Sequence, residues 1–270
     1  MSLTPGDLLG NGREAVVYAL GADRVLKVFR DAEAGSRAAA EFEVGALLHA
    51  AGLPVARPLE CVTYEGRSAL ISERIVGLDL SRTLSHAPWK VREAARVLAV
   101  AQAAMHAVAA PAELPEMHDI IEARIRSGTS APPDVFDAAL AALHALPHGE
   151  QLCHGNLHLG NVIVRDGVAV VIDCGDAARG DPWSEVAQTL VRYRCARLRP
   201  GAPLTARLGS ALGRRLLGVA YLRAYVRQTS ARAPAVLKQW EGVRAVERLA
   251  EGHPQERRRL LRLARRRLGL

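Results

Sequence analysis

The sequence predicts an α+β protein of two lobes: a small N-terminal antiparallel sheet with one helix, and a larger, mainly helical C-terminal lobe. Short β-branched segments separated by glycine turns fill residues 1–76, a pattern typical of a meandering sheet. Residues 77–270 carry mostly longer segments with apolar residues at helical spacing. Two β-branched runs around Asp166-Gly167 interrupt these helices with a strong hairpin signal. We therefore place the lobe boundary after Val76 and expect a β-hairpin within the second lobe.

The composition is that of a globular protein. The chain has 270 residues and 49% hydrophobic residues, enough for one large domain or two tightly joined lobes. No apolar run is long enough to span a membrane, and the first residues lack the pattern of a signal peptide, so we expect a cytoplasmic protein. The four cysteines are widely spaced without a C-x-x-C pair, which favours free thiols over a metal site or disulfides.

The basic charge does not by itself indicate a nucleic-acid-binding protein. The net charge is +8, but nearly all basic residues are arginines and alanine is abundant, a bias typical of GC-rich genomes. Aromatic residues make up only 4% of the chain, too few to form stacking platforms for single strands. We therefore expect neither nucleic acid nor a membrane as the main partner, and the sequence predicts no particular oligomeric state.

The first strands of the expected sheet enclose a glycine turn. Residues 8–18 form a strand, a turn containing Gly10, Asn11 and Gly12, and a second strand. The turn lacks the G-x-x-x-x-G-K-[ST] pattern of a P-loop, and no helix starts directly after it, so a dinucleotide-binding fold is not supported. A glycine turn between two strands is the device that covers phosphates in kinase-type folds.

Lys27 lies inside the third expected strand, residues 23–29, among apolar neighbours. A lysine there is either a solvated edge residue or a ligand for an anion. The helix expected at residues 32–51 carries two candidate partners for it. Glu41 lies along the buried stripe of that helix, whereas Glu43 is the rival choice.

Two further strands, residues 60–64 and 68–75, complete five strands. The segment from Glu73 through Ile75 to Gly77 then suits a hinge between the lobes. Gly77 and the polar residues 78–86 break the hydrophobic periodicity, and no helix or strand is predicted there.

The second lobe is predicted to be built from helices. Pro234 and Pro254 suit the first position of the last two, where a missing N–H costs nothing. An acidic run from Glu113 to Glu122 reads as a solvated face rather than a site for a cationic substrate. The arginine-rich last helix likewise favours a solvated face, with an anionic partner left open. The expected helices cover residues 91–105, 117–127, 134–146, 183–197, 204–228, 234–250 and 254–268.

The segment 152–176 carries the densest group of chemically active residues. A short apolar strand leads into a loop with His154, Asn156 and Asn161, and the hairpin returns to Asp173. Asp173 stands where the second hairpin strand ends, so it can face Asn161. A carboxylate and an amide oxygen that converge in this way suit a hard cation, usually Mg²⁺ carrying nucleotide phosphates.

His154, Gly155, Asn161 and Asp173 together resemble the catalytic segment of the aminoglycoside phosphotransferase and choline kinase-like superfamily, relatives of the protein kinases. That family reads H-G-D-x-x-x-x-N, followed by I-D about a dozen residues later. The resemblance implies a bilobal protein kinase-like fold, ATP (or GTP) and Mg²⁺ as cofactors, and a hydroxyl of a small molecule as phosphate acceptor. An antibiotic is one such acceptor; other small alcohols and a peptide Ser/Thr hydroxyl stay open.

The resemblance also implies a role for individual residues. In the nucleotide-binding lobe, Lys27 would hold the α- and β-phosphates and Glu41 would orient it. The 156 position would face the acceptor, next to His154. The other implied contacts are the glycine turn over the phosphates (Gly10, Asn11, Gly12), the hinge backbone on the adenine (Glu73, Ile75) and the metal ligands (Asn161, Asp173).

Asn156 is the departure from the family pattern, because it stands where the catalytic Asp is expected. Asn accepts hydrogen bonds but is not a base near neutral pH. Three interpretations follow: an inactivating substitution in a natural enzyme, a nucleotide-binding pseudokinase that regulates or scaffolds a partner, or a slow kinase that uses Asn156 only to orient the acceptor. The intact lysine and metal ligands favour phosphotransferase chemistry in the parent protein.

Overall fold

The computed structural model divides into two compact units, one of residues up to Arg82 with Leu159–Asp176, the other of Thr83–His158 with Ala177–Leu270. The hairpin region therefore groups with the N-terminal sheet by its contacts, and the expected boundary after Val76 stays a prediction. The structure describes residues 4–12, 14–30, 35–128, 130–196, 204–252 and 254–270.

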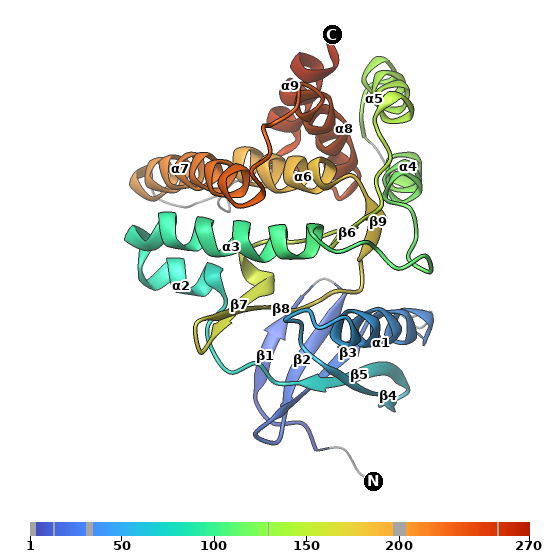
Figure 1. The fold of residues 1–270 in the computed structure, drawn as a ribbon, viewed down its shortest axis with the longest axis vertical. Coiled ribbons are helices and arrows are strands. Elements are labelled where there is room, and N and C mark those ends of the chain that lie inside the picture. Colours follow the sequence, from blue (N-terminus) through green and yellow to red (C-terminus); the bar gives the residue numbers. More distant parts are fainter. Residues whose placement is uncertain (1–3, 13, 31–34, 129, 197–203, 253) are drawn as a thin grey trace. The chain divides into compact units, whose positions relative to one another are not determined.

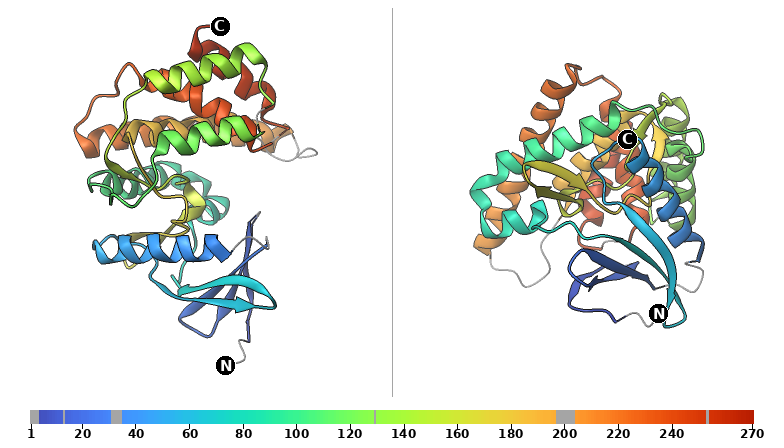
Figure 2. Two further views of the ribbon diagram at one scale, coloured as in Figure 1. Left: turned by 90° about the vertical axis from the view of Figure 1, so that its right-hand side faces the viewer. Right: turned by 60° about the horizontal axis from the view of Figure 1, so that its bottom comes forward.

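The first unit contains the predicted five-stranded antiparallel sheet and its one long helix, α1 (Gly35–Ala50), which confirms this part of the prediction (Figures 1 and 2). Residues 32–34, which were expected in α1, lie outside the described residues. The spatial order of the strands is β1-β2-β3-β5-β4. Their bounds are β1 Leu8–Asn11, β2 Ala15–Leu20, β3 Arg24–Phe29, β4 Pro58–Tyr64 and β5 Arg67–Glu73.

The central strand β3 separates two small cores because its side chains alternate between the faces of the sheet. Leu26 is fully buried on one face, in a cluster with residues of β2 and β5. Phe29 lies on the other face and packs with Ala38 of α1. Lys27 shares the parity of Phe29, so it projects from the face that α1 covers. Its position between Val17 of β2 and Leu70 of β5 fixes its height along the sheet.

The predicted hairpin is present as β7 (Val162–Arg165) and β8 (Val168–Val171). Asp166 and Gly167 form its turn with φ angles of 51° and 79°. Positive φ at both central residues is the type I′ geometry that matches the twist of a two-residue hairpin. A parallel bridge from Val55 to Val171 and the hydrogen bond from the amide of Ala56 to Val171 tie this hairpin to the rest of the first unit.

A helix that the sequence analysis missed, α2 (Leu80–His86), occupies the stretch where no helix or strand was predicted. Asp79 caps it, since its Oδ1 accepts hydrogen bonds from the amides of Ser81 at 2.9 Å and Arg82 at 3.0 Å. An acidic residue whose side chain satisfies the first amides is the usual start of a helix. The capping residue was therefore a helix signal that the loss of hydrophobic periodicity concealed.

The second unit is helical, as predicted, with one small two-stranded sheet (Figure 1). That sheet pairs β6 (Gln151–Cys153) with β9 (Ala178–Gly180), and β9 was not predicted. The helices are α3 Val91–His106, α4 Met117–Gly128, α5 Pro133–Ala145, α6 Pro182–Cys195, α7 Leu204–Thr229, α8 Leu237–Ala250 and α9 Arg257–Leu268.

The starts of the last two helices differ from the expectation. Helix α8 begins at Leu237 and α9 at Arg257, each three residues after the proline predicted to open it. The amide of Leu237 donates to the carbonyl of Pro234 at 3.1 Å, so this proline opens a tight turn that precedes the helix. Proline's fixed φ suits the first corner of such a turn as well as a helix start, which is why the two could not be told apart.

Helix α6 is the central element of the second unit and packs against α7 and α8. Nine of its side chains are buried and they lie all around the helix rather than along one stripe. Charged residues in such a helix have to find partners inside the protein. In the described part of the chain, no helix has both the length and the apolar character needed to cross a membrane.

Candidate functional site

Lys27 joins two acidic side chains within the first unit. Its Nζ donates to both carboxylate oxygens of Glu41, at 2.8 and 2.7 Å, and to Oδ1 of Asp173 at 2.5 Å. The Lys27 and Glu41 side chains are only 16% and 13% exposed, whereas Asp173 is 46% exposed. The lysine and its glutamate thus form a mostly buried pair, and the aspartate borders on solvent.

Electrostatics keep the lysine charged. Burial alone would lower the pKa of Lys27, but the charges of Glu41 and Asp173 and the hydrogen bonds to both outweigh it, so the pKa is raised. Burial raises the pKa of Glu41, and the positive charge of Lys27 opposes that rise. A cation held by two carboxylates in this way is prepared to meet an anion that displaces one of them.

The structure distinguishes the two glutamates that the sequence left open. Glu41 contacts Lys27, whereas Glu43 points to solvent and is exposed. Gly175, which the sequence analysis missed, permits the approach of the segment after Asp173. A Cβ at this glycine would lie 3.0 Å from a carboxylate oxygen of Glu41. The need for glycine at position 175 arises from this contact between distant segments, so the sequence alone did not indicate it.

Asn161 and Asp173 stand at the same end of the hairpin. The register pairs Val162 with Val171, and the amide of Ile172 donates to the carbonyl of Asn161 at 3.0 Å. Asn161 is 6% exposed. Asp173 adopts a left-handed backbone with φ of 64°, which Asp and Asn tolerate better than other non-glycine residues. The oxygen donors of these two side chains suit Mg²⁺, so the residues fit the cation that the sequence implied.

The glycine turn after β1 is tied down by Arg30, a residue not singled out from the sequence. Its Nη2 donates to Oδ1 of Asn11 at 2.5 Å, and its Nε donates to the carbonyl of Gly12 at 3.2 Å. Gly10 lies in β1 opposite Val17. Asn11 and Gly12 are therefore held by a guanidinium from the residue that follows β3.

The predicted hinge leaves β5 at Glu73. The amide of Glu73 donates to the carbonyl of Arg57 at 2.8 Å, and its carboxylate pairs with Arg165 at 2.6 Å. Ile75 is buried at 8% exposure, and its backbone makes no hydrogen bond to another described residue. Of the two hinge residues, Ile75 is the one whose backbone groups are not engaged by the rest of the described chain.

In the second unit, Glu185 of α6 holds the loop that carries His154 and Asn156. Its two carboxylate oxygens accept hydrogen bonds from the amides of Gly155 at 2.6 Å and His154 at 3.2 Å. His106 of α3 binds the same carboxylate at 2.8 Å and also contacts the Tyr225 hydroxyl. The loop backbone is thus fixed by a carboxylate that is itself fixed by a neighbouring helix.

Glu185 is expected to make the folded chain sensitive to acid. Burial would raise its pKa, but the hydrogen bond and charge of His106 and the charge of His154 lower it to about 2 from its usual 4.5. A depressed pKa stabilises the fold above pH 4.5, and the stabilisation is lost as the pH falls from 4.5 to about 2. We expect Glu185→Gln to remove a pH-dependent contribution on the order of 3 kcal/mol from the free energy of unfolding. Urea unfolding between pH 2 and 7 measures it, with exposed Glu43→Gln as the control; an unchanged pH slope in Glu185→Gln would contradict it.

Asn156 is bound by Arg192, a contact that the sequence analysis missed. The Nη2 of Arg192 donates to Oδ1 of Asn156 at 2.7 Å, and Gln188 donates to the carbonyl of Gly155 at 2.8 Å. Glu185, Gln188 and Arg192 follow one another at i, i+3 and i+7, so a single face of α6 holds residues 154–156 of the loop. That spacing of polar residues in a buried helix was the signal available from the sequence.

Two other groups of polar residues are engaged within the protein. In the acidic run, Glu116 pairs with Arg179 and Glu122 pairs with Arg126 at 2.7 Å, which leaves less charge for a cationic ligand. The ligand atoms of His106, Cys153 and Glu185 lie within 4.8 Å of one another. Burial raises the pKa of the Cys153 thiol well above its usual value, and the other two side chains are hydrogen-bonded, so this cluster is a core network.

The predicted site residues therefore form two groups, each within one unit. Lys27, Glu41 and Asp173 are in contact in the first unit. His154 and Asn156 share one loop in the second, where the amide of Asn156 lies 3.3 Å from Nδ1 of His154.

Comparison with known proteins shows the family and the fold of the chain. The family model described as phosphotransferase enzyme family matches residues 7–220. No curated protein matches the chain. Among solved structures, an amicoumacin kinase in complex with AMP-PNP and Ca²⁺ is 16% identical with a TM-score of 0.66, over 97% of this chain and 87% of that chain. A type VIII aminoglycoside-3'-phosphotransferase is 20% identical with a TM-score of 0.61, over 91% and 93%. A choline/ethanolamine kinase family protein from Mesorhizobium loti is 14% identical with a TM-score of 0.58, over 98% and 86%.

Proposed function

The chain belongs to the phosphotransferase enzyme family, and from this premise we propose that it binds ATP (or GTP) with Mg²⁺ and transfers the terminal phosphate to a hydroxyl of a small molecule. Asn156 makes this transfer slow. The acceptor site and the nucleotide site are those that the resemblance implied.

The contact of Lys27 with Glu41 carries the proposal. A lysine buried in a strand needs a partner, and a bidentate contact with one glutamate leaves its direction fixed. In kinase-type phosphoryl transfer, this ion pair is the part that places the lysine against the nucleotide phosphates. Asp173 is half exposed and also contacts Lys27. On nucleotide binding, phosphate would replace Asp173 at Lys27, and the cation would bind the Asp173 carboxylate.

The proposed metal ligands are Asn161 and Asp173. Bound Mg²⁺ would neutralise charge on the phosphates. Asp173 would contribute a carboxylate from a left-handed backbone position, and Asn161 would contribute an amide oxygen from the position just before β7. Ile75 would offer its backbone to the nucleotide base, and Gly10 with its turn would lie over the phosphates.

The acceptor would be oriented by Asn156. Its amide oxygen accepts from Arg192, so the side chain is held but is not a base. Because the transition state of phosphoryl transfer is loose, positioning and charge neutralisation sustain turnover without a base, at a lower rate. An antibiotic hydroxyl is one candidate acceptor, by likeness to the amicoumacin kinase and the aminoglycoside phosphotransferase.

A second candidate function is nucleotide binding without turnover, in which the chain regulates or scaffolds a partner. The hydrogen bond from Arg192 favours it, because the guanidinium occupies the oxygen of Asn156 that would otherwise meet the acceptor hydroxyl. Both functions require the same nucleotide site and differ only in product formation.

The nucleotide site is tested by replacing Lys27. We expect Lys27→Ala to weaken AMP-PNP binding in the presence of Mg²⁺ at least about tenfold, because a buried charge-assisted contact to phosphate is lost. Isothermal titration calorimetry with AMP-PNP and with GMP-PNP measures the affinity and the base preference. Lys238→Ala is the matched control, since Lys238 is exposed in α8. Equal affinities in both variants, or no binding of either nucleotide to the natural chain, would overturn the proposal.

A further inference from the structure

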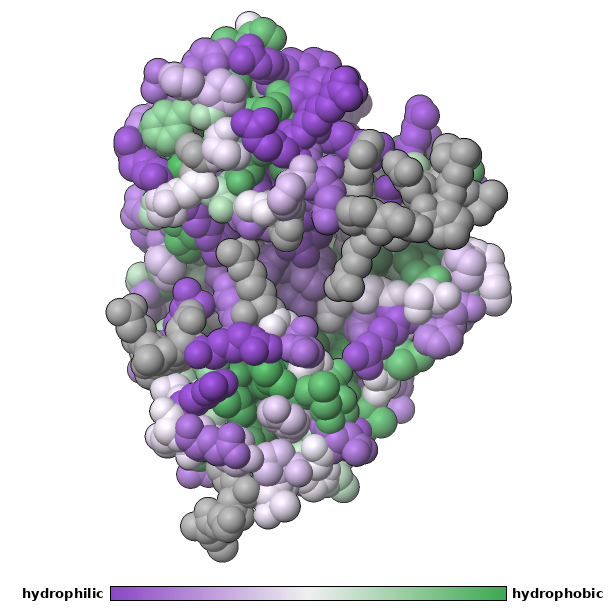
Figure 3. Space-filling view, turned by 180° about the vertical axis from the view of Figure 1, so that it is seen from behind, coloured by the Kyte–Doolittle hydropathy of each residue, from purple (hydrophilic) through white to green (hydrophobic). Residues whose placement is uncertain are grey.

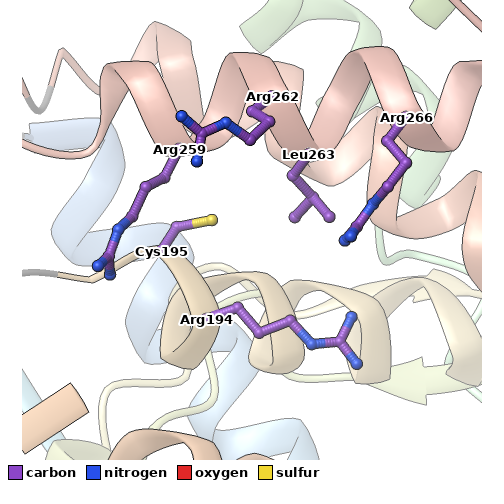
Figure 4. A pocket seen from close by; sticks show the side chains of 6 residues that line it. All are labelled: Arg194, Cys195, Arg259, Arg262, Leu263 and Arg266. Atoms are coloured by element: carbon purple, nitrogen blue, oxygen red, sulfur yellow. The ribbon is translucent and has the colours of Figure 1, made fainter.

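A pocket of about 240 Å³ lies between α6 and α9, and none of its lining residues belongs to the site described above (Figure 4). The sulfur of Cys195 and the side chain of Leu263 point into it, and arginines from both helices stand around them. Hydrophilic side chains gather on this C-terminal end of the molecule (Figure 3). The lining residues are Arg194, Cys195, Arg259, Arg262, Leu263 and Arg266.

Three of these arginines have no acidic partner among the described residues. Arg259, Arg262 and Arg266 follow one another at i, i+3 and i+7 on α9, and none forms an ion pair with a described carboxylate. Their neighbours behave differently: Arg265 pairs with Asp134 at 2.9 Å, and Arg267 pairs with Glu241 at 2.7 Å. The fourth lining arginine, Arg194 of α6, pairs with Glu241, so the uncompensated positive charge of the pocket comes from α9.

The rest of the lining supplies no compensating negative charge. Burial raises the pKa of the Cys195 thiol to about 11, so it is neutral at physiological pH. The nearby acid Glu256 is held by Arg248, whose Nε and Nη2 donate to its two oxygens at 2.7 and 3.2 Å. Like charges one helical turn apart destabilise a helix by a few tenths of a kcal/mol per pair, roughly, so this cluster costs stability unless an anion joins it.

We propose that this pocket binds a small anion that carries two or more phosphate groups. Guanidinium groups donate paired hydrogen bonds to phosphate oxygens, and three of them along one face of α9 suit a compact, multiply charged anion better than a planar carboxylate. No described aromatic side chain lines the pocket, so none of the described lining residues would stack on a nucleobase. The pocket shares no residue with the proposed nucleotide site at Lys27, and the proposal does not depend on that site.

The test is calorimetric titration of the full chain with inorganic pyrophosphate. We expect one site whose affinity falls about tenfold in Arg262→Gln or in Arg266→Gln, each of which removes one charge-assisted contact. Both arginines are exposed, so neither variant removes a core contact. Arg258→Gln is the matched control: it lies one turn before Arg262 on the same helix and outside the pocket lining, and it should retain the natural affinity.

Other outcomes overturn the proposal. If Lys27→Ala abolishes pyrophosphate binding while Arg266→Gln leaves it intact, pyrophosphate binds at the nucleotide site alone. If Arg258→Gln weakens binding as much as Arg262→Gln, the helix offers a diffuse positive field and no pocket. Tighter binding of a single-stranded oligonucleotide than of pyrophosphate, weakened alike by all three arginine variants, would assign the surface to nucleic acid instead.

Discussion

Asn156→Asp is expected to raise the rate of phosphoryl transfer about 10²- to 10⁴-fold, the range that general-base catalysis contributes. The new carboxylate would accept the proton of the acceptor hydroxyl, which the amide cannot do. Arg192 donates to this side chain at 2.7 Å and would form an ion pair with the carboxylate, so the base should be ionised well below neutral pH. Asn and Asp are isosteric, so the loop needs no rearrangement to accept the change.

The measurement is ADP release from ATP with a panel of sugars, amino alcohols, antibiotics and a Ser/Thr peptide as acceptors. Asn156→Ala is the control, since it removes the hydrogen bond to Arg192 without adding a base. A reverted chain that binds AMP-PNP yet shows no gain with any acceptor would support the binding protein over the enzyme. If ADP release rises only with the peptide, the acceptor is a protein hydroxyl and not a small molecule.

Asp173→Asn should lower the Mg²⁺-dependent part of nucleotide affinity by at least about a hundredfold, because it removes the carboxylate among the proposed ligands. Asn keeps the left-handed backbone that Asp173 adopts at φ of 64°, so the hairpin end should stay folded. Affinity for AMP-PNP without Mg²⁺ should not fall, since the lysine loses an internal acid that competes with phosphate.

The hairpin offers a matched control for that experiment. Asp166 also has a left-handed backbone, with φ of 51°, but lies at the turn at the other end of the hairpin. Asp166→Asn therefore makes the same chemical change in the same backbone conformation, and it should leave both affinities unchanged. If Mg²⁺ still raises the AMP-PNP affinity of Asp173→Asn by the natural factor, the cation binds elsewhere.

Much of the fold was predictable because its signals are local. The alternation around Lys27 and the Asp166-Gly167 turn each depend on a few consecutive residues, and both elements formed as expected. Helix α2 was missed because its signal is a single cap, Asp79, and not an apolar stripe. Pro234 was misread because a turn and a helix start place the same demand on φ.

The residues of the candidate site were predictable from their own strands, helices and loops, but the contacts between them were not. Residues such as Lys27 and Glu41 could be proposed from their elements, but their contact is a tertiary fact. Arg192 and Gly175 were missed because their roles depend on approach between segments that no local pattern records. Periodicity shows which face of a helix is buried, and it does not show what that face meets.

The hydrogen bonds between Glu185 and the loop backbone determine which substitutions position 156 can accept during evolution. The loop is anchored through its backbone amides by Glu185, which in turn is bound by His106, and none of these contacts involves the side chain at position 156. Asp and Asn can therefore exchange there with little effect on folding. A lineage could lose the catalytic base, keep a sound nucleotide-binding scaffold, and regain the base by a single codon change.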